Sequence, residues 1–548
     1  MAARNLGDGT SSRQQRDADP HLHRSLDAVQ ARQRDLNVDR GMAPLVRAQD
    51  ALARRRRIVV RDHGLTSDLF ERHAAPPRER MLRAGEQDDV VAAEREGLDA
   101  FFGRLKRDGG MTSTTHAPIV IVGGGLSGLV AANHIVRRGL PVAVLEKASA
   151  VGGRAITREK HGFLFNLGPH ALYRAGTLQQ TLCDFGIAVR GGVPTGAGGY
   201  ALYRGRRHTL PTGLASLMTT GLLDIAEKIE LARVQTALPA IDAAAADRET
   251  LSSWLDAHVR HERVRDLLRT IVRVTTFTND PERQSAGAAL AQLQLGLKGV
   301  LYLDGGWQTI VEGLRRTALA AGARIVTTSP AVGLERHDAR EVTAVRLADG
   351  TAVRACAVVI AAGPDDVDAI SGQTGFASTL PSPVRIATLD VALRSLPRPK
   401  QTVAFGIDTP LYFSVHSALA RLAPQAGALI HVSKYLRPDE NAGREVEQEL
   451  ERLMDDMQPG WRDRVEARHY LPSLMVTHAE VTAASGGLGG RPAPRLAPFD
   501  NLFVAGDWVG PRGQLSDAAA ASAADAARLA TEAAGHAAQR SGAAIQIA

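Results

Sequence analysis

The feature that most constrains this fold is a glycine-rich turn between two short apolar segments. Residues 119–122 read Ile-Val-Ile-Val, a β-branched run long enough for a buried parallel strand. Gly123, Gly125 and Gly128 follow with the spacing G-x-G-x-x-G at the start of a helical pattern. In a β-α-β unit the first glycine permits a tight turn, the second admits a pyrophosphate, and the third lets the helix pack on the strand. This predicts a parallel α/β sheet that binds a dinucleotide.

An acidic residue occurs where such a fold holds the ribose. Helical periodicity runs from Ser127 to Arg138, and a second apolar strand, residues 142–145, leads into Glu146. Glu146 comes 18 residues after Gly128, and a carboxylate there accepts hydrogen bonds from a ribose 2′-OH but repels a 2′-phosphate. We therefore predict that the first cofactor-binding residues are Gly123, Gly125, Ser127, Gly128 and Glu146.

A second glycine turn distinguishes between dinucleotides. Residues 151–154 read Val-Gly-Gly-Arg, and the planar fork of an arginine pairs with phosphate oxygens bidentately. Together with the fingerprint and the acid, this turn resembles the N-terminal signature of the FAD-dependent amine oxidase and phytoene desaturase superfamily. The resemblance implies that the cofactor is FAD, that Glu146 binds the adenosine ribose, and that Gly152, Gly153 and Arg154 lie along the diphosphate.

A further motif of the same superfamily lies near the C-terminus. Residues 501–507 read Asn-Leu-Phe-Val-Ala-Gly-Asp, and an alanine-rich helix follows Leu515. The resemblance implies that Gly506 and Asp507 contact the ribityl–diphosphate and that the helix start at Leu515 faces the flavin. A helix N-terminus there stabilises negative charge on a reduced flavin. The family usually has Ser-Gly within this helix, whereas this chain has Ser522-Ala523, which leaves the local packing open.

The resemblance also implies roles for two segments between these motifs. Residues 162–173 resemble the segment beneath the flavin ring, so we predict Gly168 as a cofactor-binding residue and His170 and Tyr173 as catalytic candidates. For His170, a structural histidine after a turn is an equal alternative. The strand near Val332 would supply backbone contacts to adenine, with a plain core valine as the alternative.

The expected fold class is α/β. It combines a Rossmann-like FAD-binding domain of the glutathione-reductase type with a discontinuous α+β substrate domain. We predict the FAD-binding domain in residues 111–200, 300–380 and 475–540, and the substrate domain in 201–299 and 381–474. Apolar residues at three-to-four spacing predict helices over 210–220, 222–238, 251–258, 264–274 and 444–456. Strand patterns occur at 324–328, 341–354, 355–362, 384–396 and 427–434.

Residues 1–110 differ from the remainder of the chain. They are rich in Arg, Asp and Gln, include the basic block 54–57, and show little apolar periodicity, which is typical of a disordered or loosely helical extension. Met111 precedes Pro118 by seven residues, where a chain of this superfamily would ordinarily start. Our hypothesis is therefore that residues 1–110 are an upstream translation or a fused fragment that catalysis does not need.

Composition restricts the partners. The net charge of +7 comes mostly from arginine, and no basic patch interleaved with aromatic residues occurs, so we expect no nucleic acid partner. Only Cys183 and Cys356 are present, which fits a reducing cytoplasm. No apolar run of transmembrane length and no secretory h-region occur. We expect a cytoplasmic protein, with a peripheral membrane contact and the oligomeric state left open.

The flavin chemistry predicts the reaction class. A flavin accepts two electrons as a hydride or its equivalent, and the protein positions a substrate carbon and excludes water. We predict two-electron dehydrogenation or desaturation of a small or apolar substrate such as an isoprenoid, with oxygen, a quinone or another electron acceptor. Residues 405–417 and 506–510 resemble bacterial phytoene-dehydrogenase-like proteins. The alternatives are an amine oxidase that produces peroxide and a non-redox flavin-binding isomerase.

Two observations count against the amine oxidase branch. Where that branch has a lysine near the flavin, residues 383–390 offer only Arg385, which stays charged and cannot shuttle a proton. Lys298 and Lys434 are alternatives that fit surface lysines better. Aromatic residues make up only 4% of the chain, which counts against an aromatic cage. Tyr412 and His416 are weaker site candidates, more typical of a pocket wall or sheet interior, and we predict no metal site.

Overall fold

A parallel sheet forms around the glycine-rich turn. The computed structural model describes residues 117–196 and 198–540, and the predicted extension, residues 1–110, lies outside them. The strands of this five-stranded sheet are β10 (Arg324–Val326), β2 (Val142–Leu145), β1 (Ile119–Val122), β14 (Ala357–Ile360) and β20 (Leu502–Val504), in that spatial order. Every neighbouring pair is parallel. The predicted α/β fold is confirmed at the level of its mixed sheet and helix content.

Both faces of this sheet are buried, as its continuous apolar runs predict. Alternate residues of β1 belong to different clusters: Ile119 and Ile121 join one, and Val120 and Val122 join the other. The second cluster lies under a three-stranded antiparallel sheet and one helix. These elements are β11 (Ala331–Arg336), β12 (Val342–Leu347), β13 (Ala352–Arg354) and α12 (Pro364–Ser371).

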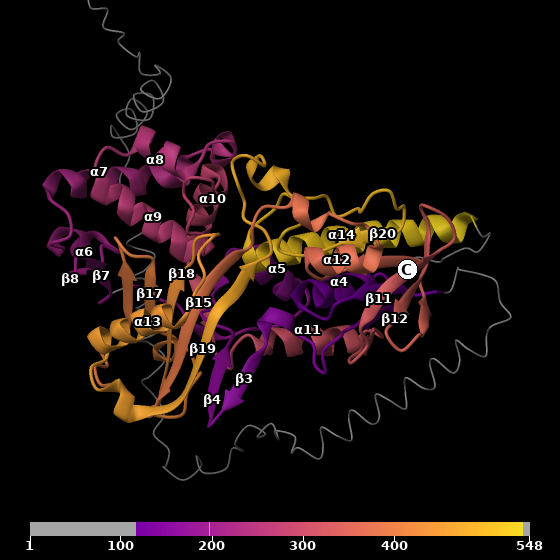
Figure 1. The fold of residues 1–548 in the computed structure, drawn as a ribbon, viewed down its shortest axis with the longest axis horizontal. Helices are drawn as coiled ribbons and strands as arrows, with labels where there is room; N and C mark the ends of the chain where they lie inside the picture. Colours follow the sequence, from indigo (N-terminus) through magenta and orange to yellow (C-terminus); the bar gives the residue numbers. More distant parts are fainter. Residues whose placement is uncertain (1–116, 197, 541–548) are drawn as a thin grey trace, which may run out of the picture. The chain divides into compact units, whose positions relative to one another are not determined.

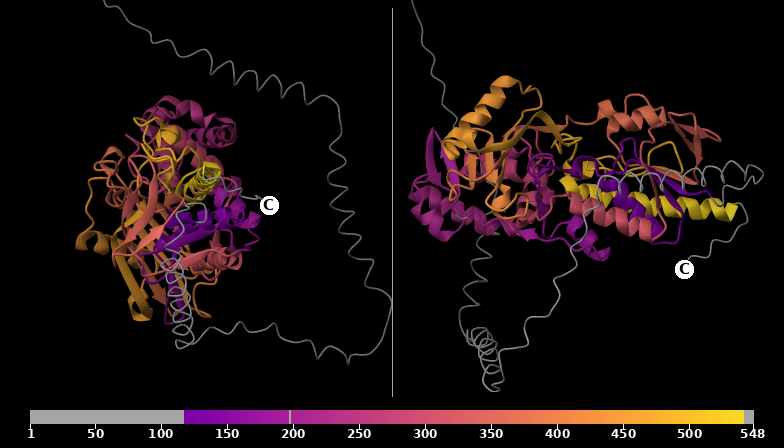
Figure 2. Two further views of the ribbon diagram at one scale, coloured as in Figure 1. Left: turned by 90° about the vertical axis from the view of Figure 1, so that its right-hand side faces the viewer. Right: turned by 90° about the horizontal axis from the view of Figure 1, so that it is seen from below.

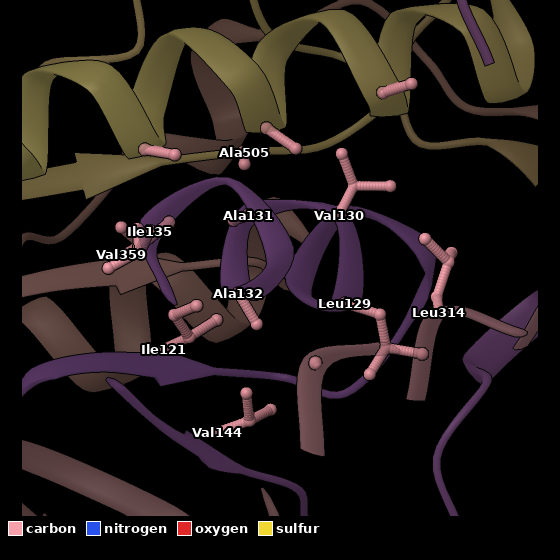
Figure 3. Close-up of a cluster of buried hydrophobic side chains, with 14 of the residues drawn as sticks. Ile121, Leu129, Val130, Ala131, Ala132, Ile135, Val144, Leu314, Val359 and Ala505 are labelled. Carbon is pink, nitrogen blue, oxygen red and sulfur yellow. The ribbon is translucent and has the colours of Figure 1, made fainter. Parts of the chain in front are cut away.

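Three helices cover the opposite face. They are α4 (Leu126–Val136), α11 (Gln308–Ala320) and α14 (Leu515–Arg540). Figure 3 shows α4 between the sheet and α14, whose alanine side chains let the two helices approach closely. Figure 2 shows α14 as a long yellow helix, and α4 packs against both α14 and α11. Ala523 is fully buried in this cluster, so alanine is accommodated where the family usually has glycine.

A second, seven-stranded sheet lies beside the first region (Figure 1). Its strand order is β19 (Val465–Thr477), β15 (Val384–Leu393), β18 (Ala428–Tyr435), β17 (Leu411–Val415), β16 (Val403–Gly406), β7 (Tyr200–Tyr203) and β8 (Arg206–Thr209). Apolar side chains of one face pack on α13 (Arg444–Met457). The predicted strands at 384–396 and 427–434 and the helix at 444–456 are confirmed by β15, β18 and α13.

Five helices pack against the β7 and β16 end of this sheet (Figure 1). They are α6 (Leu214–Thr219), α7 (Ile225–Ala237), α8 (Leu251–His258), α9 (Glu262–Thr276) and α10 (Ala286–Gly296). The four helices predicted between residues 210 and 274 are confirmed. The first of them, α6, begins at Leu214 rather than at Leu210, with Gly213 as its N-cap. Periodicity missed α10, which is buried along most of its length and therefore lacks a polar face.

Shorter elements complete the fold. They are β3 (Thr157–Lys160), β4 (Phe163–Asn166), β5 (Leu172–Tyr173), α5 (Thr177–Asp184), β6 (Gly191–Gly192) and β9 (Val300–Leu303). The predicted division into two discontinuous domains stays a prediction.

Candidate functional site

A cavity of about 380 Å³ lies at the carboxyl ends of the parallel strands. The turn after β1, the residue after β2, the Gly152–Arg154 turn and the first turn of α14 all contribute to its wall. This is where open α/β sheets bind ligands, because helix N-termini and loops converge there. Of the residues predicted from sequence, the structure brings together Gly123, Gly125, Ser127, Glu146, Gly152, Gly153, Arg154, His170, Gly506, Asp507 and Leu515.

Glycine is needed at each of the three fingerprint positions for a different structural reason. A Cβ on Gly123 would lie 2.5 Å from the carbonyl oxygen of Ala361, and one on Gly128 would lie 1.9 Å from that of Gly123. A Cβ on Gly125 would meet no protein atom within 4 Å, although Gly125 lines the cavity. Two glycines are therefore required by the protein itself, whereas Gly125 leaves a surface for close approach of a ligand. This cradle fits the diphosphate of a dinucleotide.

Glu146 is buried at the end of β2. Its Oε2 accepts a hydrogen bond from the Gly124 N–H at 2.6 Å, and its Oε1 accepts one from the Ala148 N–H at 2.8 Å. A carboxylate has about four lone-pair positions, so both oxygens retain capacity for ribose hydroxyls. The geometry fits the role predicted for this residue.

Arg154 and Asp507 form an ion pair within the cavity wall. Arg154 Nη1 lies 2.8 Å from Asp507 Oδ2 and also donates to the carbonyl of Val476 at 2.5 Å. His478 Nδ1 lies 2.9 Å from Asp507 Oδ1. Burial alone would raise the pKa of Asp507, but the charge of Arg154 and the contact with His478 outweigh it and hold that pKa below its usual value. The N-terminal and C-terminal motifs therefore meet in one charged cluster.

The first turn of α14 closes another part of the wall. Leu515, Ser516 and Ala519 line the cavity, and Leu515 has a φ of +54°, which is rare for a leucine and costs conformational energy. Ser522 Oγ donates to the carbonyl of Gly506 at 2.8 Å and accepts from the Gly506 N–H at 3.0 Å. This reciprocal contact fixes the Gly506–Asp507 turn against the helix.

The remaining wall is largely apolar and aromatic. It includes Phe277, Trp307, Ile386 and Leu474, together with His170. The His170 ring lies 5.0 Å from that of Trp307, and its Nδ1 is 3.1 Å from the carbonyl oxygen of Gly168. Burial lowers the pKa of His170 to about 4, so the ring is neutral at pH 7. These contacts favour a positioning role for His170 over proton transfer.

Four predicted site residues lie outside the cavity lining. Gly128 packs against Gly123, as described above. Gly168 adopts a φ of +72° between the lining residues Leu167 and Pro169. Tyr173 is buried, and its hydroxyl donates to the carbonyl of Thr275 at 2.7 Å; its catalytic role stays a prediction. The Val332 side chain is exposed and Ala331 lines the cavity instead; the backbone contact proposed for Val332 stays a prediction.

Trp307 and His478 are among the contributors to the wall that sequence reasoning missed. His478 follows the long strand β19, 324 positions from its contact Arg154, and no local motif marks it. Trp307 follows the Gly305-Gly306 turn, a segment in which the sequence predicted no site residue. Both residues reach the cavity only through the packing of distant segments.

The cavity-side face of the seven-stranded sheet carries a buried polar row that sequence reasoning also missed. His431 Nδ1 lies 2.7 Å from Asp390 Oδ1, and both side chains are fully buried. Asp390 Oδ2 accepts a hydrogen bond from the Gly168 N–H at 3.2 Å. The His416 ring lies 4.5 Å from that of His431, and its Nε2 lies 3.2 Å from the Tyr412 hydroxyl. Tyr412, on β17, and His416, directly after that strand, are therefore buried in a polar network.

The lysine alternatives lie elsewhere. Lys434 pairs with Glu440 and Glu449 at 2.9 Å each, and Lys298 is exposed. In the part of the chain that the structure describes, Lys147 is the lysine that lines the cavity, and it pairs with Asp366. Within the same residues, no cluster of His, Cys, Asp or Glu is arranged to hold a metal ion.

Comparisons with known proteins show which family this chain resembles. Residues 126–390 match the family model of flavin-containing amine oxidoreductases. Protoporphyrinogen oxidase 1 of Arabidopsis thaliana is 34% identical over 133 residues, which cover 23% of this chain and 25% of that protein. Carotenoid 3,4-desaturase of Haloarcula japonica is 34% identical over 76 residues, which cover 14% of this chain and 15% of that protein. The chain thus spans a quarter or less of the length of these relatives.

A solved structure shows the same fold over most of the chain. Cyclohexylamine oxidase from Brevibacterium oxydans IH-35A superposes with a TM-score of 0.57 at 16% identity, covering 77% of this chain and 99% of that one. The predicted cofactor class, a flavin, and the recognition from the motifs are confirmed by the family match and by a flavin-containing relative. Over residues 126–390, this chain is similar to the flavin-containing amine oxidoreductases.

Proposed function

We propose that the protein catalyses a two-electron dehydrogenation or desaturation of an apolar substrate, with FAD as the oxidant. The observation that carries this proposal is the apolar and aromatic wall formed by Phe277, Trp307, Ile386 and Leu474, next to a charged end built for a dinucleotide. When bound, FAD accepts a hydride or its equivalent from substrate carbon.

The chain's own residues would hold the cofactor from both ends. Glu146 would accept hydrogen bonds from the adenosine ribose, and Arg154 with the start of α4 would bind the diphosphate. The start of α14 would face the flavin, where its partial positive charge favours a reduced ring. The apolar wall would orient the substrate and exclude water. A neutral His170 would keep the segment under the flavin in place through its bond to Gly168.

Anaerobic mixing tests the substrate class. Purified, FAD-loaded protein is mixed with an isoprenoid polyene, a porphyrinogen, or primary and secondary amines, and the flavin absorption band is followed. We expect bleaching with the polyene or another apolar donor. Bleaching by amines alone, with peroxide release in air, would replace the proposal with amine oxidation. A protein that binds FAD and is bleached by no donor would favour the isomerase alternative.

One observation keeps amine oxidation as the second candidate. Despite the low aromatic content, three buried or half-buried rings gather near the cavity-lining Phe277. Its ring centroid lies 5.9 Å from that of Tyr435, which lies 6.5 Å from Tyr412, which in turn lies 5.7 Å from Phe405. Aromatic faces attract cations, so a protonated amine would also find partners here.

An apolar surface on α6 and α7 supports a peripheral membrane contact. Leu214 and Met218 on α6 and Ile225 and Ile229 on α7 are each at least half exposed, with Ile225 at 77%. Each pair is four residues apart and therefore shares one helix face. No helix within residues 117–196 and 198–540 combines the length and apolarity needed to cross a bilayer. We therefore propose surface attachment, through which an apolar substrate would be collected.

Basic residues next to this surface suggest anionic lipid as the partner. Thr220, which ends α6, donates to the carbonyl of Thr209 at 2.7 Å and thus holds α6 beside β8. Arg206 and Arg207 on β8 are exposed, and juxtaposed cations strengthen attachment to anionic headgroups.

Vesicle sedimentation tests the attachment. We expect binding to vesicles that contain phosphatidylserine, and a marked loss in the double variant Leu214→Ser, Ile225→Ser. The exposed Leu419 lies outside this surface, so Leu419→Ser is the matched control. Equal sedimentation of the wild type and the double variant would contradict the membrane proposal without affecting the flavin chemistry.

A further inference from the structure

A buried carboxylate without a charged partner lies in the first turn of α14. The Asp517 residue is 1% exposed, and its Oδ1 accepts a hydrogen bond from the Leu178 N–H at 2.8 Å. Its Oδ2 is buried and has no hydrogen-bond partner among the described residues. Buried carboxylates are ordinarily paired or fully hydrogen-bonded, because an uncompensated buried charge is costly. This half-satisfied group therefore needs an explanation.

Two helix starts meet at this carboxylate. Leu178 is the second residue of α5, so its N–H is one of the donors that the helix itself leaves unpaired. Asp517 is the third residue of α14. Gly176 makes room for the side chain, since a Cβ there would lie 2.4 Å from both carboxylate oxygens. Asp517 thus serves as a cap for α5 while it belongs to the first turn of another helix.

The same turn of α14 forms the cavity wall. Leu515, Ser516 and Ala519 line the cavity, whereas the Asp517 side chain is directed to α5. The carboxylate therefore lies within one helical turn of the cavity without touching its contents. A charge at this distance acts on a ligand through the interior of the protein, where screening by water is weak.

The groups around Asp517 leave its charge uncompensated. Burial raises its pKa to about 6, and the Leu178 N–H opposes that rise. From β5, Tyr173 interacts electrostatically with it but is a neutral phenol, because burial raises its pKa. Before α14, Arg491 donates to the carbonyls of Asp507 and Gly513, and Arg512 pairs with Asp525 at 2.9 Å.

We propose that Asp517 is a positioning residue that sets the electrostatic potential of the flavin-facing start of α14. The inference rests on the proposed placement of the flavin at this helix. When Asp517 is ionised, its charge offsets the partial positive charge of about half a unit that a helix N-terminus carries. When it is neutral, the full helix charge favours the reduced, more negative cofactor.

Reduction and proton uptake are then linked. Two electrons added to the cofactor place negative charge near Asp517, which makes its carboxylate a stronger base and draws one proton from solvent onto an oxygen. By reciprocity, protonation of Asp517 makes the cofactor easier to reduce. No bond other than this O–H bond is formed on the protein.

An anaerobic redox titration between pH 5 and pH 8 tests the inference. We compare FAD-loaded wild-type protein with Asp517→Asn, which keeps an oxygen for the Leu178 N–H. At pH 7.5 we expect a more positive midpoint potential in the variant. The wild-type profile should bend near pH 6, and the variant profile should lack this bend. Glu532→Gln removes a half-exposed carboxylate from a distant turn of α14 and should leave the profile unchanged.

The failures of the two proposals are distinguishable. Wild-type protein that binds no FAD would remove the proposed function and this inference together. Protein that binds FAD but gives parallel profiles for wild type and Asp517→Asn would overturn the role of Asp517 alone. Should Asp517→Asn not fold, an infrared difference spectrum of the wild type decides the question. A carboxylic acid band, shifted by carbon-13 aspartate and appearing on reduction, supports the inference, and its absence contradicts it.

Discussion

The two ends of the cavity are built in different ways. The dinucleotide end consists of tight turns whose key residues are close in sequence, from Gly123 to Arg154, and its geometry depends on backbone shape and charge. The apolar end consists of single side chains such as Phe277, Ile386 and Leu474, which arrive from separate helices and strands. The comparison teaches that the glycine turns of one end are specified largely by local sequence, whereas the apolar end is assembled by the packing of distant segments.

The largest expected effect separates two glycines of one motif. Gly128→Ala would place a methyl group 1.9 Å from the Gly123 carbonyl oxygen, so we expect a loss of at least about 3 kcal/mol in unfolding free energy. Gly125→Ala meets no protein atom and should keep the wild-type melting temperature but bind FAD at least about tenfold more weakly. Denaturant unfolding and flavin content measure the two quantities. Equal destabilisation by both variants would contradict the distinction between Gly128, needed for packing, and Gly125, needed for the approach of a ligand.

The next effect concerns the pair that joins the two ends of the chain. Arg154→Ala removes the guanidinium partner of the buried Asp507 and leaves the contact with His478. We expect a loss of about 2–3 kcal/mol of stability, a value already reduced because the Arg154 side chain is 39% exposed. The double variant with Asp507→Asn should recover most of that stability but not FAD binding. Because the pKa of Asp507 is lowered on folding, its contribution is complete above about pH 4 and is lost as the pH falls. A pH-independent cost of Arg154→Ala between pH 7 and pH 2 would contradict this account.

Asp517 should respond in the opposite direction. Its folded pKa is raised from 3.8 to about 6, so ionisation removes stability as the pH rises from about 4 to about 6. That shift corresponds to a destabilisation of the folded state by about 3 kcal/mol. The amide that Asp517→Asn leaves without a partner cancels part of the stability gained by removing the charge. We expect the variant to be more stable than wild type by about 1–2 kcal/mol at pH 7.5, with the difference vanishing near pH 4. Urea unfolding at both pH values checks this, and a variant less stable at pH 7.5 would be inconsistent with a destabilising charge.

The smallest effect on stability is expected at the apolar end. Phe277→Leu keeps an apolar side chain in the wall and should cost no more than about 1.5 kcal/mol. Flavin content should stay unchanged, while kcat/KM for the best apolar donor changes roughly tenfold or more. Leu297→Ala, at an exposed position outside the lining, is the control and should alter neither quantity. A loss of FAD in Phe277→Leu would show that the two ends are not independent.

Much of the cofactor end was predictable, since strand, turn, helix and acid follow one another within residues 119–154. Sequence patterns carry less information where a side chain's direction depends on distant partners. Tyr173 is adjacent in sequence to the segment that lines the cavity, yet its hydroxyl is held by Thr275 on α9. Conversely, nothing near His478 in sequence marks it, because its contacts are Arg154 and Asp507.

By itself, the sequence predicted the parallel sheet and a turn suited to a dinucleotide, and its resemblance to a known superfamily implied a flavin. The β-branched runs and the spacing of the glycines lie within residues 119–154, so both patterns are visible without knowledge of distant partners. Only the tertiary structure decided that Asp507 is paired with Arg154 while Asp517, ten residues later, is buried alone. Both residues are aspartates, but a distant segment supplies Asp507 with a charged partner and none of the described segments does so for Asp517. The pKa of Asp507 is therefore lowered, whereas burial raises that of Asp517.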